Sequence, residues 1–455
     1  FSVKLSPHEC THAYQPDTEV GTDIASKIEK TSMDLIAIAV PFFLALILAE
    51  FIYGIARGRN TYRLNDTINS LSMGSLSSLS GLVIVGGSAL IYEFIVKTFQ
   101  LTQLPAESTL VWVVTFVLYD LAYYWKHRLG HEVALFWGSH VSHHQSEDYN
   151  LGTALRQTSI DFHGFLFLIP FFIVGVPGEV LVATVSLNLI YQFWVHTQHV
   201  PKLGPIEWIM VTPSNHRVHH ARNDQYVDKN YGGVFIIWDR LFGTFQDELA
   251  EEPAVYGLRK PLNSWNPLWA NTHVYWRLLI DFVKMKGIKN KVQLLFKPPG
   301  WLPADYTKTC KAAAPVDLKS KYDPKVAGIT RAYVFGQFII TVVVSLSLAE
   351  LATVASTVEL WAAAGFIALS LFTHGYILDK RVRSTPLECS RLLLAVGLAY
   401  LLPLGAALAA ILSYSAAASL IMIAVGIVTR RSILAAEGKR NDDRQLVKEL
   451  PGASA

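Results

Sequence analysis

One stretch of the sequence decides the fold: Thr109–His144, TLVWVVTFVLYDLAYYWKHRLGHEVALFWGSHVSHH. Its first half is an apolar run of the kind that crosses a bilayer, which takes about 20 apolar residues. Its second half carries five histidines, and the first of them follows closely on the end of the apolar run. Since neutral imidazole is a common metal ligand, the stretch predicts a membrane helix that presents metal ligands at its end.

The composition of the whole chain also indicates a membrane protein. Of its 455 residues, 51% are hydrophobic and only 16% are charged, whereas soluble domains carry about 25% charged residues. The net charge of +3 is too small to indicate a nucleic-acid partner. Three widely separated cysteines, Cys10, Cys310 and Cys389, argue against a disulfide framework and against a cysteine-based zinc site.

Further apolar runs recur along the chain at lengths that suit membrane helices. The uninterrupted runs are Leu35–Ala56, Leu79–Val96, Thr109–Trp125, Tyr333–Val354, Val358–Leu378, Leu392–Ala410 and Ser413–Val428. The run Phe162–Val195 is interrupted by Pro177-Gly178 and predicts a hairpin of two short helices. We therefore expect an all-α integral membrane protein, a polytopic helical bundle of about eight or nine membrane helices including the hairpin.

Lysine and arginine gather in the loops on one side of the expected bundle, and such loops face the cytosol. The topology that satisfies this bias puts the N-terminus in the lumen and every histidine motif at the cytosolic face. The expected organisation is a lumenal segment (1–33), a catalytic membrane domain (34–305), a linker (306–330), C-terminal transmembrane helices (331–432) and a cytosolic tail (433–455). The stretch Tyr275–Trp301 mixes apolar residues with lysines, and predicts either an interfacial helix or a helix packed on the catalytic domain.

Eleven of the fifteen histidines lie between His127 and His220, and most of them form three boxes. The boxes are His127/His131, His140/His143/His144 and His216/His219/His220. Residues four apart share a helical face, but neighbours such as His143 and His144 point about 100° apart and cannot easily bind one ion. The spacing therefore predicts a centre of two metal ions, with His196 completing the set of ligands around the second ion. His163 and His199 are expected to be bystanders.

The ligand type narrows the choice of metal. Nitrogen ligands without thiolate suit iron, zinc, copper or nickel. Structural zinc usually takes four ligands, often including cysteine, around one ion, so a redox-active pair of Fe ions fits better. Two carboxylates lie near the boxes. Asp120 is expected to fix a ligand histidine through its second N–H, and Glu132 to orient a bound cosubstrate; both are candidate catalytic residues.

The boxes and the longer stretches around them resemble a known superfamily. The boxes are similar to those of the fatty acid hydroxylase/sterol desaturase superfamily. The longer stretches resemble its alkylglycerol monooxygenase family: Ser146–Gln157, Tyr191–Thr197, Thr212-Pro-Ser-Asn-His-Arg-Val-His-His220, Asp228-Lys-Asn-Tyr231 through Ile236-Ile-Trp-Asp-Arg-Leu-Phe-Gly-Thr-Phe245, Val255–Leu258 and Phe296-Lys-Pro-Pro-Gly-Trp301.

The resemblance implies a non-haem di-iron centre at the cytosolic face of the endoplasmic reticulum membrane, with O2 and tetrahydrobiopterin as cosubstrates. It implies hydroxylation of the ether-linked alkyl carbon of alkylglycerols or lyso-ether lipids, giving a hemiacetal that collapses to a fatty aldehyde and a glycerol derivative. It also implies Glu132 as a required acidic neighbour and the eight box histidines as ligands, with no ligand role for Asn215. Arg156 and Lys229 are candidates for contacts to the head group or the pterin.

Other functions remain open at this point or lack their motifs. A sterol or fatty acid hydroxylase or desaturase fed by cytochrome b5 would use the same boxes, and a metal transporter or metal-storing scaffold would also use histidines. The chain lacks HExxH, GxSxG, P-loop and GxGxxG motifs, so zinc protease, serine hydrolase, NTPase and dinucleotide sites are unsupported. Membrane lipids are the expected partners, and a homodimer is left open.

Overall fold

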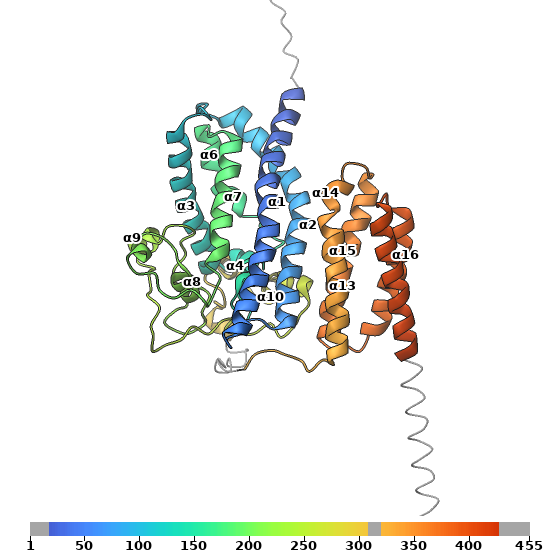
Figure 1. Ribbon diagram of the computed structural model, residues 1–455. Helices are drawn as coiled ribbons and strands as arrows, with labels where there is room; N and C mark the ends of the chain where they lie inside the picture. The colour runs from blue at the N-terminus through green and yellow to red at the C-terminus, as the bar shows by residue number, and fades with distance from the viewer. Residues whose placement is uncertain (1–17, 308–319, 427–455) are drawn as a thin grey trace, which may run out of the picture.

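The computed structural model describes residues 18–307 and 320–426, and over these ranges the regular secondary structure is helical (Figure 1). No strand forms within them, and the only β-pairing there consists of two isolated bridges, Met210–Phe235 and Ala221–Tyr256. The all-α prediction is therefore confirmed for the described residues. The expected tail 433–455 lies outside them, as do parts of the expected segments 1–33 and 306–330.

Long helices of the N-terminal half stand side by side (Figure 1). They are α1 (Thr18–Ala56), α2 (Leu64–Phe99), α3 (Thr109–Glu132) and α7 (Gly178–Trp194). The last residues of α3 include the first histidine box. Helix α7 packs against both α1 and α3. One apolar core joins α2 and α3 to the hairpin through Ile95, Tyr119, Phe171 and Val180, and all four side chains are buried.

Four helices of the described residues are long and apolar enough to cross a membrane by length and composition. They are Ile38–Ala56, Gly328–Leu346, Thr357–Leu378 and Ala406–Gly426. The expected runs Leu79–Val96 and Thr109–Trp125 lie inside α2 and α3, whose 36 and 24 residues also reach the length of a bilayer. The larger count of about eight or nine membrane helices stays a prediction.

The hairpin forms where the sequence predicts it, with a very short first arm. Helix α6 (Ile169–Val174) has only six residues, about 9 Å of rise, which cannot cross a bilayer. It ends at Gly175, whose φ of 93° is left-handed and suits glycine. A Cβ at Gly175 would also lie 1.8 Å from the Thr102 carbonyl oxygen, so the turn requires glycine for space as well as for conformation.

The predicted run Leu392–Ala410 is wrong as a single helix. Helix α16 (Ser384–Leu401) begins earlier and stops at Leu401, and the next helix begins at Ala406. Pro403 causes the break, because proline has no N–H to donate and disfavours helical backbone in the residue before it. Leu402 accordingly has ψ of 147°, which is extended.

The C-terminal helices pack against the N-terminal half. Helices α13 (Gly328–Leu346) and α15 (Thr357–Leu378) both contact α2. The backbone N–H of Trp265 donates to Asp379 Oδ1 at 2.8 Å. Gly375 lies so close to Trp265 that a Cβ there would be 2.2 Å from its carbonyl oxygen. The two halves therefore share a packed interface.

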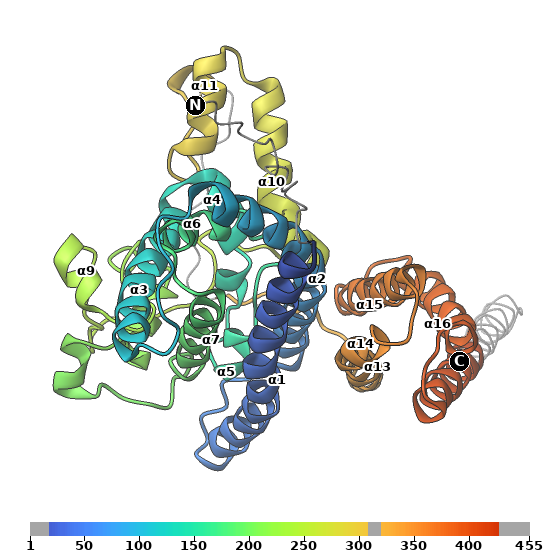
Figure 2. The same cartoon turned by 90° about the horizontal axis from the view of Figure 1, so that it is seen from above.

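The stretch Tyr275–Trp301 packs on the catalytic domain with one face, and its interfacial alternative stays a prediction. Helix α10 (Pro267–Lys284) packs on α4 (Ala134–His140), where the Tyr275 hydroxyl bonds to Ser139 Oγ at 2.6 Å. Figure 2 shows α10 and α11 (Ile288–Phe296) reaching sideways from the bundle, across the direction of the long helices. Their outer face exposes a stripe of apolar side chains: Trp276, Leu279, Val283, Ile288, Val292 and Phe296.

We expect this outer stripe to lie in the membrane interface, since apolar faces flanked by lysine insert about 5–10 Å into the head-group boundary. Nitroxide labels on Leu279→Cys and Val292→Cys, in a chain whose three native cysteines are serine, should be accessible to O2 and shielded from a water-soluble relaxant. A label on Arg277→Cys, an exposed position of α10, is the matched control and should stay water-accessible. Equal water accessibility at all three positions would contradict the assignment.

Candidate metal centre

Nine histidines come together in two adjacent groups at one end of the N-terminal bundle. Within each group, one ring nitrogen per residue lies within 4.8 Å of all the others. The first group is His127, His131, His140, His144 and His219, and the second is His143, His196, His216 and His220. These are the nine predicted ligands. The structure also separates the neighbours His143 and His144, and likewise His219 and His220, into different groups, as the two-metal interpretation requires.

Short helices with defined ends position the boxes. Helix α3 ends at Glu132, because Val133 adopts extended backbone with ψ of 119°, and α4 then carries His140 on its last turn. The third box lies on α8 (Pro213–His219), which begins with a capping box: Thr212 and Asn215 exchange side-chain hydrogen bonds with each other's backbone. Asn215 therefore serves the helix end and lies outside both histidine groups.

The Nε2 atoms of each group point at one another. In the first group, His140 Nε2 lies 3.0 Å from both His127 Nε2 and His144 Nε2. In the second group, His196 Nε2 lies 3.2 Å from His143 Nε2 and 3.0 Å from His216 Nε2. Each group thus gathers nitrogen atoms around one shared point.

The opposite ring nitrogens determine the tautomers. Nδ1 of His143 donates to the Arg156 carbonyl oxygen at 2.9 Å, and Nδ1 of His196 donates to that of Gln192 at 2.7 Å. A carbonyl oxygen only accepts, so each Nδ1 carries the proton and each Nε2 of the neutral ring presents a lone pair. Two lone pairs facing each other at 3.2 Å repel unless a cation lies between them. The donor set therefore fits a bound metal ion, and carbonyl-oriented histidine is the usual arrangement around one.

Burial keeps the rings of His143, His216 and His220 neutral at physiological pH. Desolvation lowers the pKa of His143 to about 4, partly opposed by its hydrogen bond to the Arg156 carbonyl. Desolvation, followed by the neighbouring imidazoles, holds the pKa values of His216 and His220 well below the usual 6.5. Neutral imidazole is the form that binds metal, so protons compete little for these nitrogens near pH 7.

The two predicted bystanders lie outside both groups. His163 stacks on Phe136 with ring centroids 4.5 Å apart, and it lines a cavity described below. His199 packs edge-on against Tyr53 with centroids 5.2 Å apart.

Asp120 does not bind a ligand histidine as the sequence suggested. Its carboxylate accepts four hydrogen bonds, from the backbone N–H groups of Val234 and Phe235 and from the side chains of Asn188 and Trp238, all at 2.8–2.9 Å. Apart from Asn188, these partners belong to the loop 231–236 and to Trp238, at the start of the following helix α9 (Ile237–Phe242). Asp120 is linked to the centre through that loop, whose Tyr231 carbonyl oxygen accepts from His127 Nδ1 at 2.8 Å.

Arg156 also differs from its prediction, which was a contact to the head group or the pterin. The side chain is 2% exposed, and its guanidinium donates to the Ser142 carbonyl, to Asn69 Oδ1 and to Gln145 Oε1 at 2.6–2.9 Å. Burial lowers its pKa to about 10, which leaves it charged. The guanidinium thus braces the segment that carries the second box, and its donors are used by groups of the protein itself.

Glu132 and Lys229 lie at the rim of the first group. Glu132 Oε1 accepts from Arg128 Nε at 2.9 Å, and its side chain is 39% exposed, so it remains open to a bound cosubstrate. Lys229 contributes through its backbone, since its carbonyl oxygen accepts from His219 Nδ1 at 3.0 Å.

The sequence did not reveal the backbone carbonyl groups that orient the ligand histidines, or the residues that hold those carbonyl groups in position. Asp239 is the clearest case: its two carboxylate oxygens accept from the backbone N–H groups of Tyr231 and Gly232 at 2.7 and 2.8 Å. The signal for this region was the family-like stretch from Asp228 through Phe245, which contains Asp239 but does not reveal its role. Within it, Asp228 and Asn230 adopt left-handed backbone with φ of 59° and 56°.

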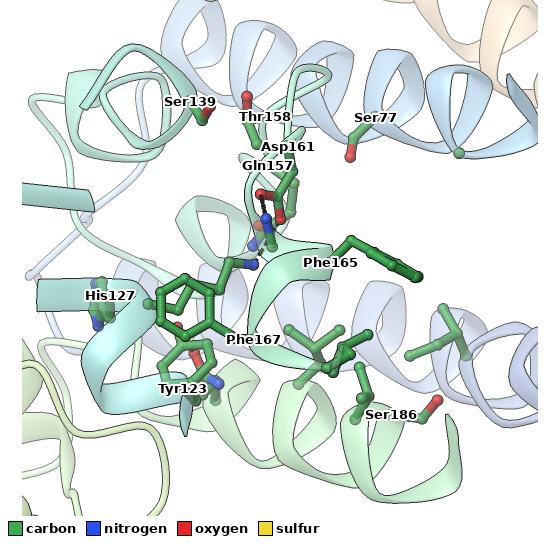
Figure 3. A pocket seen from close by; sticks show the side chains of 18 of the residues that line it. Ser77, Tyr123, His127, Ser139, Gln157, Thr158, Asp161, Phe165, Phe167 and Ser186 are labelled. Atoms are coloured by element: carbon green, nitrogen blue, oxygen red, sulfur yellow. Dashed lines mark hydrogen bonds and ion pairs between the residues drawn. The ribbon is translucent and has the colours of Figure 1, made fainter. Parts of the chain in front are cut away.

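A cavity of about 650 Å³ opens beside the centre. Both histidine groups reach it, through His127 and His140 from the first and His143 and His196 from the second. Its other walls are mainly apolar and come from α1, α2, α3 and the hairpin; among the lining residues are Phe43, Phe165, Leu168, Phe172, Leu181 and Val185. Figure 3 shows His127 and Tyr123 with Phe165 and Phe167 among the side chains around this space.

The comparisons with known proteins agree with this geometry. A family model for fatty acid hydroxylases matches residues 112–244, and one for the alkylglycerol monooxygenase C-terminal domain matches residues 330–416. The chain is 37% identical over 364 residues to alkylglycerol monooxygenase of Xenopus tropicalis, covering 79% of this chain and 81% of that one. The human alkylglycerol monooxygenase is 36% identical with the same coverage. An ornithine lipid hydroxylase of Rhizobium tropici is 31% identical over 30% of this chain and 41% of its own length. No solved structure matches.

Proposed function

The chain belongs to the alkylglycerol monooxygenase family, and from that premise we propose that it hydroxylates the ether-linked alkyl carbon of alkylglycerols and lyso-ether lipids. The product is a hemiacetal, which collapses to a fatty aldehyde and a glycerol derivative. The C-terminal match supports this reaction over the sterol and fatty acid hydroxylations of the wider superfamily, because that family model belongs to alkylglycerol monooxygenases.

The two histidine groups would hold two non-haem iron ions, one in each group. When bound, the iron pair would supply O2 activation and tetrahydrobiopterin the two electrons that reduce the second oxygen atom to water. The chain's own contribution is orientation. Carbonyl oxygens fix the rings of His127, His143 and His196, so that each Nε2 faces its ion without rearrangement.

The cavity is the observation that carries the substrate assignment. It is lined by ligands of both groups and extends between apolar side chains of α1 and the hairpin. An alkyl tail would fill this apolar part, where Phe172 and Leu181 exclude water. The ether carbon would then lie against the histidine groups, with the head group at the polar part of the wall.

The protein is a membrane protein, and we place its active site on the cytosolic side of the endoplasmic reticulum membrane. The lysine and arginine bias of the loops supports this orientation, and the apolar helices support the embedding itself.

Purified protein in lipid nanodiscs, loaded with iron, tests the proposal directly. We expect release of fatty aldehyde from 1-O-hexadecylglycerol that requires both O2 and tetrahydrobiopterin. Turnover that ignores the pterin and instead requires reduced cytochrome b5, with a sterol or fatty acid as substrate, would overturn the assignment in favour of the wider superfamily. Metal analysis of the same sample should find two ions per chain.

A further inference from the structure

The apolar cavity contains one charged cluster that the metal centre does not use: Lys126, Asp161 and His163, all of which line it. Lys126 Nζ donates to Asp161 Oδ2 at 2.6 Å. His163 Nδ1 lies 3.5 Å from Asp161 Oδ1. Figure 3 shows Asp161 grouped with Gln157 and Thr158 in one part of the wall.

The chain makes room for this cluster. The backbone N–H of Gly164 donates to Asp161 Oδ1 at 3.0 Å. A Cβ on Gly164 would lie 2.7 Å from Asp161 Oδ2 and 2.9 Å from Lys126 Nζ. Glycine at this position therefore lets the ion pair pack directly against the backbone. This packing holds both charged groups in place in the cavity wall.

The cluster also has unused hydrogen-bonding capacity. The ammonium group of Lys126 has three N–H donors, and within residues 18–307 and 320–426 only Asp161 accepts from it. His163 is 3% exposed, and its Nδ1 has no hydrogen-bond partner in the same ranges. A buried polar atom without a partner is costly, so a ligand or ordered water is expected there.

The position of the cluster fits the polar end of an ether lipid. Lys126 immediately precedes the metal ligand His127 on α3, and both line the cavity. In an alkylglycerol, one ether oxygen separates the carbon that is oxidised from the glycerol carbons. The glycerol hydroxyls must therefore bind close to the histidine groups, and this cluster supplies charged groups there.

We propose that Lys126, Asp161 and His163 form the head-group site, and that they bind the two hydroxyls of an uncharged glycerol in preference to a phosphate ester. This inference rests on the proposed function. The Asp161 carboxylate accepts from the hydroxyls, while Lys126 and His163 hold their oxygen atoms. The positive charge of Lys126 is already balanced by Asp161, so a phosphate would bring an uncompensated negative charge next to the Asp161 carboxylate in a largely apolar cavity.

The variant Asp161→Asn tests the charge preference. We expect KM for 1-O-hexadecylglycerol to rise about tenfold or more, since a hydrogen bond to a charged group is lost, while kcat changes much less. KM for the matching lyso-alkylphosphocholine should stay the same or fall, because the repelling carboxylate is gone. The ratio of kcat/KM for the two substrates therefore shifts toward the phospholipid.

Two further variants keep the test decisive. His163→Phe preserves the stacking on Phe136 but removes both ring nitrogens, and should weaken alkylglycerol binding without affecting metal content. Asp247→Asn, in the exposed Lys202–Asp247 pair, is the matched control and should match wild type. Unchanged substrate preference in both Asp161→Asn and His163→Phe, with two metal ions retained, would overturn the proposal.

The proposed function and the head-group site fail in different ways. Wild-type protein that cleaves no ether lipid would refute the function, and equilibrium binding of 1-O-hexadecylglycerol to wild type and variants would then decide the site by itself. Wild-type cleavage with variants that bind and turn over both substrates like wild type would refute only the head-group site.

Discussion

Replacing His143 with alanine is expected to reduce the metal content from two ions per chain to about one and to lower turnover by at least about 100-fold. His143 belongs to the second group, which has four histidines, and its Nε2 lies 3.2 Å from His196 Nε2. Removal of residues that only orient ligands costs 10- to 100-fold in metal affinity or activity, so loss of a ligand should cost more. The group would retain three nitrogens and bind its ion weakly.

Separate variants can assign each ion to its group. His131→Ala should remove a ligand from the first group, which has five histidines, and His220→Ala should remove one from the second group. His273→Ala is the control, because His273 lies on α10 outside both groups and its Nδ1 bonds to the Ala270 carbonyl oxygen. Metal analysis by mass spectrometry and aldehyde release are measured on the same samples. Two ions and full activity in His143→Ala would refute the two-group assignment.

The spacing of the histidines was enough to predict the two groups. Neighbours on a helix cannot point at one ion, so His143/His144 and His219/His220 had to divide between two. His196 could be added because it follows the end of an apolar run at the same edge of the membrane. The apolar runs likewise predicted α1, α13 and α15, because length and hydropathy are local properties that can be read from the sequence.

What the sequence could not predict depends on contacts between distant segments. The carbonyl oxygens that orient His127 and His219 belong to the loop residues Tyr231 and Lys229. A backbone carbonyl carries no residue-specific signal, so only the folded chain reveals it. The sequence placed the charge of Arg156 near the boxes and so predicted a contact to the head group or the pterin, but Asn69 of α2 and Gln145, next to the second box, accept from its guanidinium.

The Asp120→Ala variant is expected to unfold far more readily than wild type, by about 4 kcal/mol or more. The carboxylate is completely buried, and its removal leaves four donors without an acceptor: the N–H groups of Val234 and Phe235, the Trp238 indole and the Asn188 amide. Asp120→Asn should rescue little, because its NH2 group would meet other donors where an oxygen now accepts.

Asp120 anchors the loop that follows Tyr231, so its loss should also disturb the metal centre. The loop carries the Tyr231 carbonyl that orients His127, so Asp120→Ala should lose metal from the five-histidine group together with stability. Thermal unfolding in detergent and metal analysis follow the two effects, and Asp224→Ala, whose side chain is 86% exposed in a surface ion pair, should change neither. A purely catalytic Asp120 predicts the opposite pattern, with normal stability and metal content but no turnover. The structure favours the loop anchor, because every partner of the carboxylate is a group that shapes the fold.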